Sequence, residues 1–172
     1  MLALNCGSGQ RPFTSLPDEG VKWINIDINE RWNPDVCTDW NNLSMFADAS
    51  VDYVVSHHSL EHVGCGEGDG FIREAYRVLK PGGSLLVFVP DMGALAKRWL
   101  EGGLSDQIYM TNVYGAYMGH EEDRHRWGYT DKSLWLALCG WKWLSVGRFD
   151  FRSIPGADIA QDFWILGMEA VK

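Results

Sequence analysis

Basic residues are scarce in this sequence, and they are nowhere clustered. Fifteen Lys and Arg residues stand against 23 Asp and Glu residues in a chain of 172, which gives a formal net charge of −8. Nucleic acids and anionic membrane surfaces bind clusters of Lys and Arg, because those side chains neutralise phosphates. The composition therefore argues against a nucleic-acid partner, and we expect no membrane partner.

Long apolar runs and paired cysteines are missing as well. No apolar stretch approaches the roughly 20 residues of a membrane-spanning helix, and the N-terminus has no basic segment followed by an apolar one. The four cysteines form no CxxC pair, which is typical of a reduced intracellular chain. Repeats, low-complexity tracts and linkers are absent too. We expect a single cytoplasmic domain over residues 1–172, and the sequence indicates no oligomeric state.

What the chain does have is an alternation of short apolar segments with helical patterns. Hydrophobic residues make up 46% of it, with nine Trp, enough for one globular core. The expected strands are 2–5, 22–28, 34–40, 50–58, 84–90, 141–149 and 162–170, and the expected helices are 70–80, 92–101 and 130–140. Alternating strands and helices predict an α/β fold with a mostly parallel sheet. The last two strands have no helix between them, so we expect them to pair antiparallel at one edge.

Polar and small residues follow three consecutive strands at the point where each one ends. Gly7-Ser8-Gly9 comes after the first strand, Asp27 ends the second, and Asp39-Trp40 follows the third. Glycine lets a ligand approach the backbone without meeting a Cβ atom. An acid about 20 residues further on is where nucleotide folds bind ribose hydroxyls, and a carboxylate beside an indole can accept from and stack on adenine. Singly, each feature also suits an ordinary turn or helix cap; together they predict a nucleoside-containing cofactor.

A third glycine, which dinucleotide folds use to bring a helix start close to the pyrophosphate, is missing after Gly9. Gln10-Arg11-Pro12 stands there instead. A cofactor without phosphate suits this loop better, and S-adenosylmethionine, an adenosine joined to an amino acid through a sulfonium, meets that requirement.

The motifs also resemble a known family. "LALNCGSG", "WINIDI", "PDVCTDW", "SVDYVVSHHSLEHV" and "REAYRVLKPGGSLLVFVPD" look like the successive motifs of class I S-adenosylmethionine-dependent methyltransferases, from residue 2 to about residue 91. The later "GHEEDRHRWGYTDKSLWLALCGW" is similar to a stretch of small methyltransferases of the type 11 kind, which often sit near sugar or surface-polysaccharide functions. The resemblance implies a Rossmann-like, three-layer fold with a seven-stranded, mostly parallel sheet and an antiparallel edge strand.

The resemblance also implies where the cofactor binds. The glycine loop would line its methionine end, the acid after the second strand would bind the ribose, and the acid and indole after the third strand would meet the adenine. Asn5 stands where many members carry an acid near the methionine amino group. The implied cofactor-binding residues are Asn5, Gly7, Ser8, Gly9, Asp27, Ile28, Asp39, Trp40, Ser56 and His57.

Histidines and acids gather in two places, "HHSLEH" at 57–62 and "HEEDRH" at 120–125. Methyl transfer to an oxygen needs a group that takes the acceptor's proton, and histidine suits that role at neutral pH. We expect His125 to be the catalytic base, with His62 as the second candidate; alternatively, these histidines brace loop backbones. His58 and His62 are spaced as a metal pair on a helix would be. Methyl transfer to oxygen requires no metal, however, and we expect none.

Residues 103–129 are irregular, polar and aromatic at once, and they follow the fifth strand. Long irregular segments in compact domains are usually functional, so we expect a lid over the acceptor site. Five aromatic residues in it would form either a wall for a small acceptor or part of the core: Tyr109, Tyr114, Tyr117, Trp127 and Tyr129.

The sequence thus predicts an enzyme that transfers a methyl group from S-adenosylmethionine to an oxygen of a small-molecule or saccharide acceptor. DNA amino-methylation is disfavoured, because "SHHS" replaces the [ND]PP[YF] signature after the fourth strand. The chain begins directly at the first strand, which leaves a non-catalytic cofactor-binding module as the alternative. A nicotinamide-dependent oxidoreductase is a third possibility, disfavoured by the absent third glycine.

Overall fold

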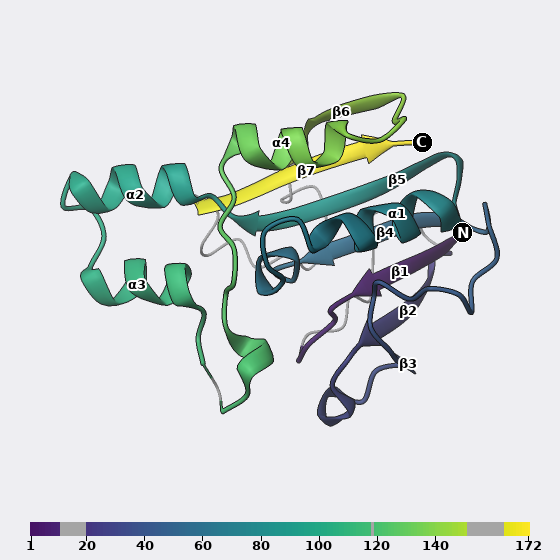
Figure 1. Cartoon of the computed structure of the whole chain (residues 1–172), viewed down its shortest axis with the longest axis horizontal. Coiled ribbons are helices and arrows are strands. Elements are labelled where there is room, and N and C mark those ends of the chain that lie inside the picture. The colour runs from purple at the N-terminus through teal and green to yellow at the C-terminus, as the bar shows by residue number, and fades with distance from the viewer. Residues whose placement is uncertain (11–19, 118, 151–163) are drawn as a thin grey trace.

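A computed structural model describes residues 1–10, 20–117, 119–150 and 164–172. Its centre is a seven-stranded sheet of order β3-β2-β1-β4-β5-β7-β6 (Figure 1). The strands span Leu2–Cys6 (β1), Lys22–Asp27 (β2), Val36–Cys37 (β3), Val51–His57 (β4), Leu79–Pro90 (β5), Ser145–Arg148 (β6) and Ile165–Val171 (β7). Strands β1 to β5 pair in parallel, and β7 pairs antiparallel with both β5 and β6. The predicted Rossmann-like α/β fold with an antiparallel edge is confirmed.

Helices α1 (Gly68–Val78) and α4 (Asp131–Cys139) lie over one face of this sheet (Figure 1). Side chains alternate along each strand, so Leu4, Val54 and Leu85 share one core with buried residues of these two helices. Ala3, Val55 and Leu86 point to the opposite face and belong to a second cluster. Among the described residues, the side chains that pack on this second cluster include Trp23, Tyr53 and Ile165, and no described helix contributes to it.

The boundaries differ from the predicted ones mainly around Pro81. Helix α1 ends at Val78, and β5 begins at Leu79, five residues before the strand predicted at 84. Proline disfavours helical backbone at the residue before it, and Gly82 has a φ of 81° that lets the chain turn between the two halves of the strand. Helix α4 begins at the predicted N-cap, Thr130, whose side chain accepts a hydrogen bond from Ser133 N at 3.3 Å.

The segment after β5 is more regular than the sequence indicates. Helix α2 (Met92–Leu100) is followed by α3 (Asp106–Tyr114), which falls inside the stretch predicted to be irregular. The two helices pack through the stacked rings of Trp99 and Tyr109, whose centroids are 4.5 Å apart. Across the described parts of the chain, no helix combines the length and the apolar character needed to cross a bilayer.

Candidate active site

A cavity of about 660 Å³ opens at the carboxyl ends of the parallel strands. This volume is in the usual range for a small-molecule site. Its walls come from the turn after β1, from residues 26–32 and 38–41, from residues 58–67 after β4, and from Ala116 and residues 122–126. The last wall belongs to the segment between α3 and α4, which passes in front of the strand ends (Figure 1). The residues predicted at the ends of the first three strands, Ser8 excepted, therefore line one cavity together with His62 and His125.

The two glycines after β1 serve different purposes. Gly7 and Gly9 both have positive φ, 73° and 51°. A Cβ atom on Gly7 would collide with the side chain of Ser59, whereas one on Gly9 would meet no atom within 4 Å. Both glycines line the cavity, so Gly7 permits close packing against Ser59 and Gly9 leaves space for a ligand.

This difference leads to a paired prediction. Alanine at either position adopts a left-handed conformation at a cost of about 1–2 kcal/mol, but only Gly7→Ala also overlaps Ser59. We expect Gly7→Ala to lower the free energy of unfolding more than Gly9→Ala does, measured by urea denaturation. Equal losses in the two variants would contradict the assignment.

Asp27 ends β2 with both carboxylate oxygens directed at backbone amides. Gly9 N donates to its Oδ2 at 2.8 Å, and Asn29 N donates to its Oδ1 at 2.8 Å. The residue is 9% exposed and lines the cavity. Each carboxylate oxygen can accept a second hydrogen bond. Asp27 can therefore hold the glycine loop in place and still bind ligand hydroxyls.

The next wall carries the acid and the indole predicted to meet an adenine. Asp39 is exposed and Trp40 half-buried, and both line the cavity. The Trp40 ring stacks on Phe71 of α1 with centroids 4.6 Å apart, which fixes its orientation. Ile28 is 61% exposed where β2 ends, and as a cavity-lining side chain it offers apolar surface to a ligand.

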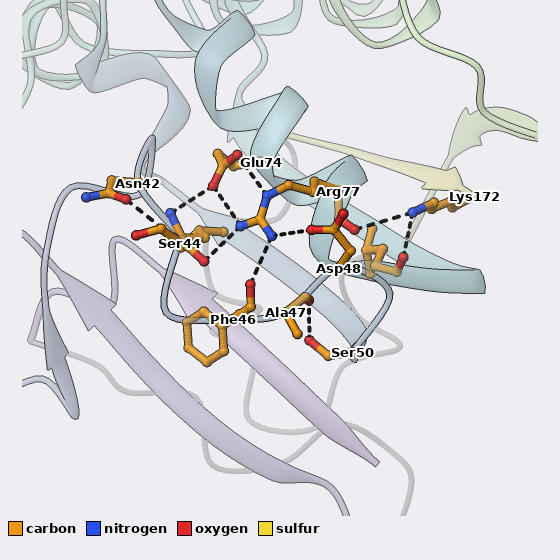
Figure 2. Close-up of polar contacts among 11 residues, drawn as sticks. Asn42, Ser44, Phe46, Ala47, Asp48, Ser50, Glu74, Arg77 and Lys172 are labelled. Carbon is orange, nitrogen blue, oxygen red and sulfur yellow. Dashed lines mark hydrogen bonds and ion pairs between the residues drawn. The ribbon is translucent and has the colours of Figure 1, made fainter.

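Arg77 of α1 anchors the loop that follows Trp40 (Figure 2). Its guanidinium donates to the carbonyl oxygens of Leu43 and Phe46 at 2.9 Å each, and to the carboxylates of Glu74 and Asp48. Hydrogen bonds from Arg77 lower the pKa of Glu74, although burial opposes the shift. This loop directly follows the cavity-lining residues 38–41, so the hydrogen bonds of Arg77 help to hold those residues in position.

We expect Arg77→Ala to lower the free energy of unfolding by about 2–3 kcal/mol, because two carbonyls and two carboxylates lose a charged donor. Arg73→Ala, on an exposed position of the same helix, is the matched control and should stay within about 0.5 kcal/mol of wild type. Equal losses in the two variants, measured by chemical denaturation, would show that the network contributes little.

Three histidines from the segments after β4 and before α4 surround one buried acid, Glu61. Glu61 lies in the short helix η2 (Leu60–His62) and is 1% exposed. His58 Nδ1 lies 3.2 Å from its Oε1, and His125 Nε2 lies 3.9 Å from the same oxygen. The rings of His62 and His125 are edge to face, with centroids 4.8 Å apart. Both predicted catalytic histidines therefore lie beside each other and beside Glu61.

The backbone brings this cluster together over a long sequence separation. Arg126 N and Trp127 N both donate to the carbonyl oxygen of Glu61, at 2.8 and 3.1 Å. His125 N donates to Tyr114 O at 3.1 Å. These bonds fix His125 against η2 although it follows Glu61 by more than 60 residues.

The protonation of the cluster follows from its burial and its contacts. Burial lowers the pKa of His125, against the opposing effects of the Glu61 carboxylate and the Asn112 carbonyl. Burial alone would raise the pKa of Glu61, but the hydrogen bond with His58 and the neighbouring imidazoles lower it below its ordinary value. The arrangement favours an ionised Glu61 beside a neutral His125.

Two side-chain contacts attach the segment that carries His125 to the turn that follows β2. Asn29 Nδ2 donates to Glu122 Oε1 at 2.9 Å. Arg31 Nη2 donates to Asp123 Oδ1 at 2.7 Å, in a pair whose side chains are 22% and 10% exposed. In the predicted lid, residues 103–129, the first half contains α3, and the residues that line the cavity all come from the second half.

Not every predicted site residue lines the cavity. Asn5 is buried and donates to Asn25 Oδ1 of β2 at 3.0 Å. Ser8, Ser56 and His57 also lie outside the lining; Ser56 is fully buried, and the His57 ring packs against His58. A role for these four residues in cofactor binding stays a prediction.

Glu61 was not among the residues predicted for the site, and for two of the five aromatic residues the structure supports a packing role over an acceptor wall. Tyr129 is buried in the core, and Tyr109 stacks on Trp99. Neither lines the cavity. The signal for Glu61 in "HHSLEH" was its position three residues after His58 and one before His62, which lets an acid contact imidazoles within one short turn.

The charge of the cavity suits a cationic ligand. Its charged lining residues, histidines aside, are Asp27, Asp39, Glu67, Glu122, Asp123 and Arg126. A pyrophosphate would meet repulsion from so many acids, whereas a sulfonium and an ammonium group would be attracted. With the open backbone at Gly9 and the accepting oxygens of Asp27, the residues present fit S-adenosylmethionine better than a dinucleotide.

Comparisons with known proteins agree with this geometry. A methyltransferase-domain family model matches residues 2–87. No curated protein matches the sequence. A possible histamine N-methyltransferase from Thermotoga maritima has a similar structure, with 15% identity and a TM-score of 0.60; the match covers 99% of this chain and 81% of that one.

Two further solved structures are similar in fold. A SAM-dependent methyltransferase from Archaeoglobus fulgidus has 14% identity and a TM-score of 0.64, over 99% of this chain and 86% of that one. A 1,6-didemethyltoxoflavin-N1-methyltransferase from Burkholderia thailandensis, solved with S-adenosylhomocysteine, has 16% identity and a TM-score of 0.57, over 99% and 70%. The family match covers half of the chain and all of its glycine-loop and strand-end motifs. The chain belongs to the methyltransferase-domain family and is a class I S-adenosylmethionine-dependent methyltransferase.

Proposed function

We propose that this methyltransferase methylates an oxygen of a small-molecule or saccharide acceptor, with His125 as the base that takes the acceptor's proton and His62 as the second candidate. The observation that carries the proposal is that both imidazoles line the same cavity as the strand-end residues Asp27 and Asp39. A proton acceptor therefore shares one space with the residues that fit the cofactor.

The cofactor side of the proposal rests on the strand ends. When bound, S-adenosylmethionine supplies a methyl group activated by its sulfonium sulfur. Asp27 accepts hydrogen bonds from ribose hydroxyls, Asp39 accepts one from the adenine amino group, and Trp40 and Ile28 contact the adenine ring. We assign the remaining contacts of the cofactor to the turn after β1 and the end of β4, at Asn5, Gly7, Ser8, Gly9, Ser56 and His57.

The tautomer of His125 supports its role as a base. A carbonyl oxygen can only accept, so the contact of 2.7 Å between His125 Nδ1 and Asn112 O places the proton of the neutral ring on Nδ1. The lone pair is then on Nε2, which can receive a proton from an acceptor hydroxyl. His62 Nδ1 lies 3.2 Å from Arg124 O, so the same argument leaves the lone pair of His62 on Nε2.

We further propose that residues 103–129 form the lid on the acceptor side. Ala116, His125 and Arg126 of this segment line the cavity. Tyr117 and Trp127, which neighbour these residues in the chain, are 51% and 41% exposed. The Arg124 guanidinium lies over the Tyr117 ring, 4.4 Å from its centroid, and the exposed part of the Trp127 ring offers a surface that suits the apolar face of a sugar ring. Free, exposed thiols at Cys37 and Cys65 support a reducing, cytoplasmic setting.

The test is a turnover assay with paired acceptors. The enzyme is incubated with S-adenosylmethionine and with sugars, phenols or alcohols, each beside its amino analogue, and release of S-adenosylhomocysteine is measured. We expect transfer to members of the hydroxyl series. Transfer only to the amines would overturn the oxygen acceptor, and cofactor binding without turnover on any acceptor would favour a binding module.

A further inference from the structure

Three potential metal ligands meet at the acceptor side of the cavity. One donor atom from each of Glu61, His62 and His125 lies within 4.8 Å of the other two. Donors around a tetrahedral Zn²⁺ with bonds of about 2.0–2.1 Å are about 3.4 Å apart. The donor atoms therefore need to approach one another by about 1–1.5 Å to hold such an ion.

Both histidines have the tautomer that a metal requires. Each ring places Nδ1 against a backbone carbonyl oxygen, His125 against Asn112 and His62 against Arg124. Metal-binding histidines commonly donate one ring N–H to a carbonyl or carboxylate, which leaves the other nitrogen as the ligand. The two Nε2 atoms thus have lone pairs ready for a cation.

The carboxylate of Glu61 provides a second, independent observation. Its Oε2 is buried and has no hydrogen-bond partner among the described residues, while its Oε1 lies 3.2 Å from His58 Nδ1. A buried carboxylate oxygen without a partner is costly. A cation would satisfy it, and the contact with His58 would orient the carboxylate as ligand carboxylates usually are.

From this geometry we infer that Glu61, His62 and His125 form a binding site for a divalent transition-metal cation of the Zn²⁺ and Co²⁺ class. Two imidazole nitrogens and one carboxylate suit such ions, whereas Mg²⁺ and Ca²⁺ prefer oxygen ligands. The site differs from the His58 and His62 pair considered in the sequence, because His62 ends the short 3-10 helix η2, whereas His58 precedes that helix and faces Glu61. It also opposes the expectation that the protein binds no metal.

The cation and the acceptor's proton compete for the same lone pair. In methyl transfer to a hydroxyl, the acceptor oxygen would form a bond to the methyl carbon while the bond from that carbon to the sulfonium sulfur breaks, with its electron pair staying on sulfur, and the hydroxyl proton would go to Nε2 of His125. A cation bound to that nitrogen prevents the proton transfer, so bound metal inhibits turnover. Inhibition rests on the proposed function, whereas metal binding does not.

The binding test uses Co²⁺ as a spectroscopic probe on the intact, chelator-treated protein, without cofactor or acceptor. We expect one Co²⁺ per chain, with the visible absorption of a low-symmetry cobalt site, displaced by Zn²⁺ and unaffected by Mg²⁺ at the same concentration. Glu61→Gln and His62→Gln should each weaken binding by at least about 10- to 100-fold. His120→Ala, at an exposed histidine outside the cavity, should bind as wild type does.

Thermal melts of the variants distinguish a loss of binding from a loss of folding. Two ligand variants are used, so that the test still stands if one of them does not fold. No saturable cobalt signal, or equal affinity in wild type and in a folded ligand variant, would overturn the metal site and leave the proposed base intact. Binding with inhibition of turnover supports both proposals. Binding with faster turnover supports the site but overturns His125 as the base.

Discussion

His125→Ala is expected to lower kcat by about 10²–10⁴-fold in metal-free buffer, the usual loss when a general base is removed. The affinity for S-adenosylhomocysteine should change little, because the cofactor-side residues Asp27 and Asp39 belong to other walls of the cavity. The measurements are steady-state turnover with the acceptor found in the paired assay and calorimetric titration with S-adenosylhomocysteine.

The alternative for His125 is a purely structural role. Its ring contacts Asn112 O, and its backbone N donates to Tyr114 O, so the residue also braces the end of α3. If bracing is its only role, the melting temperature and cofactor affinity of His125→Ala should fall together with the rate. His120→Ala is the matched control, since it removes an exposed histidine from the same segment without touching the cavity.

Asp27→Ala is expected to weaken binding of S-adenosylhomocysteine by roughly 5- to 150-fold, the equivalent of about 1–3 kcal/mol for hydrogen bonds to a charged group. Two effects act in the same direction. The ligand hydroxyls lose their acceptor, and Gly9 N and Asn29 N lose the carboxylate that holds the loop in place. Isothermal titration calorimetry gives the change directly.

The conservative variant Asp27→Asn removes only part of both effects, because an amide offers one accepting oxygen where the carboxylate offers two. We expect its affinity to lie between those of wild type and Asp27→Ala. Glu30→Ala makes the same change in net charge at an exposed position of the adjacent turn and should bind as wild type does. Unchanged affinity in Asp27→Ala, or tighter binding of NAD than of S-adenosylhomocysteine, would contradict the assignment.

The sheet and its ligand side could be predicted from the sequence, because the signals for them are local. An uncharged apolar run such as 84–90 identifies a buried strand by itself, and the carboxyl ends of parallel strands meet at one edge. The position of a residue at the end of one of the first three strands was therefore enough to predict that it lies at the ligand side of the sheet. This holds for Gly9, Asp27, Asp39 and Trp40. Helix α3 lacked such a signal. None of its residues is buried, so it has no apolar periodicity to reveal it.

The sequence by itself determined the family, the alternation of strands and helices and the strand ends that line the cavity, since each depends on residues close together in the chain. Only the tertiary structure decided which glycine packs and which leaves room, because Ser59, far along the chain from Gly7, sets that difference. It also decided that Glu61 and His62 lie against His125. The hydrogen bonds from Arg126 and Trp127 to the carbonyl of Glu61 join two segments more than 60 residues apart, and no local pattern encodes such a contact.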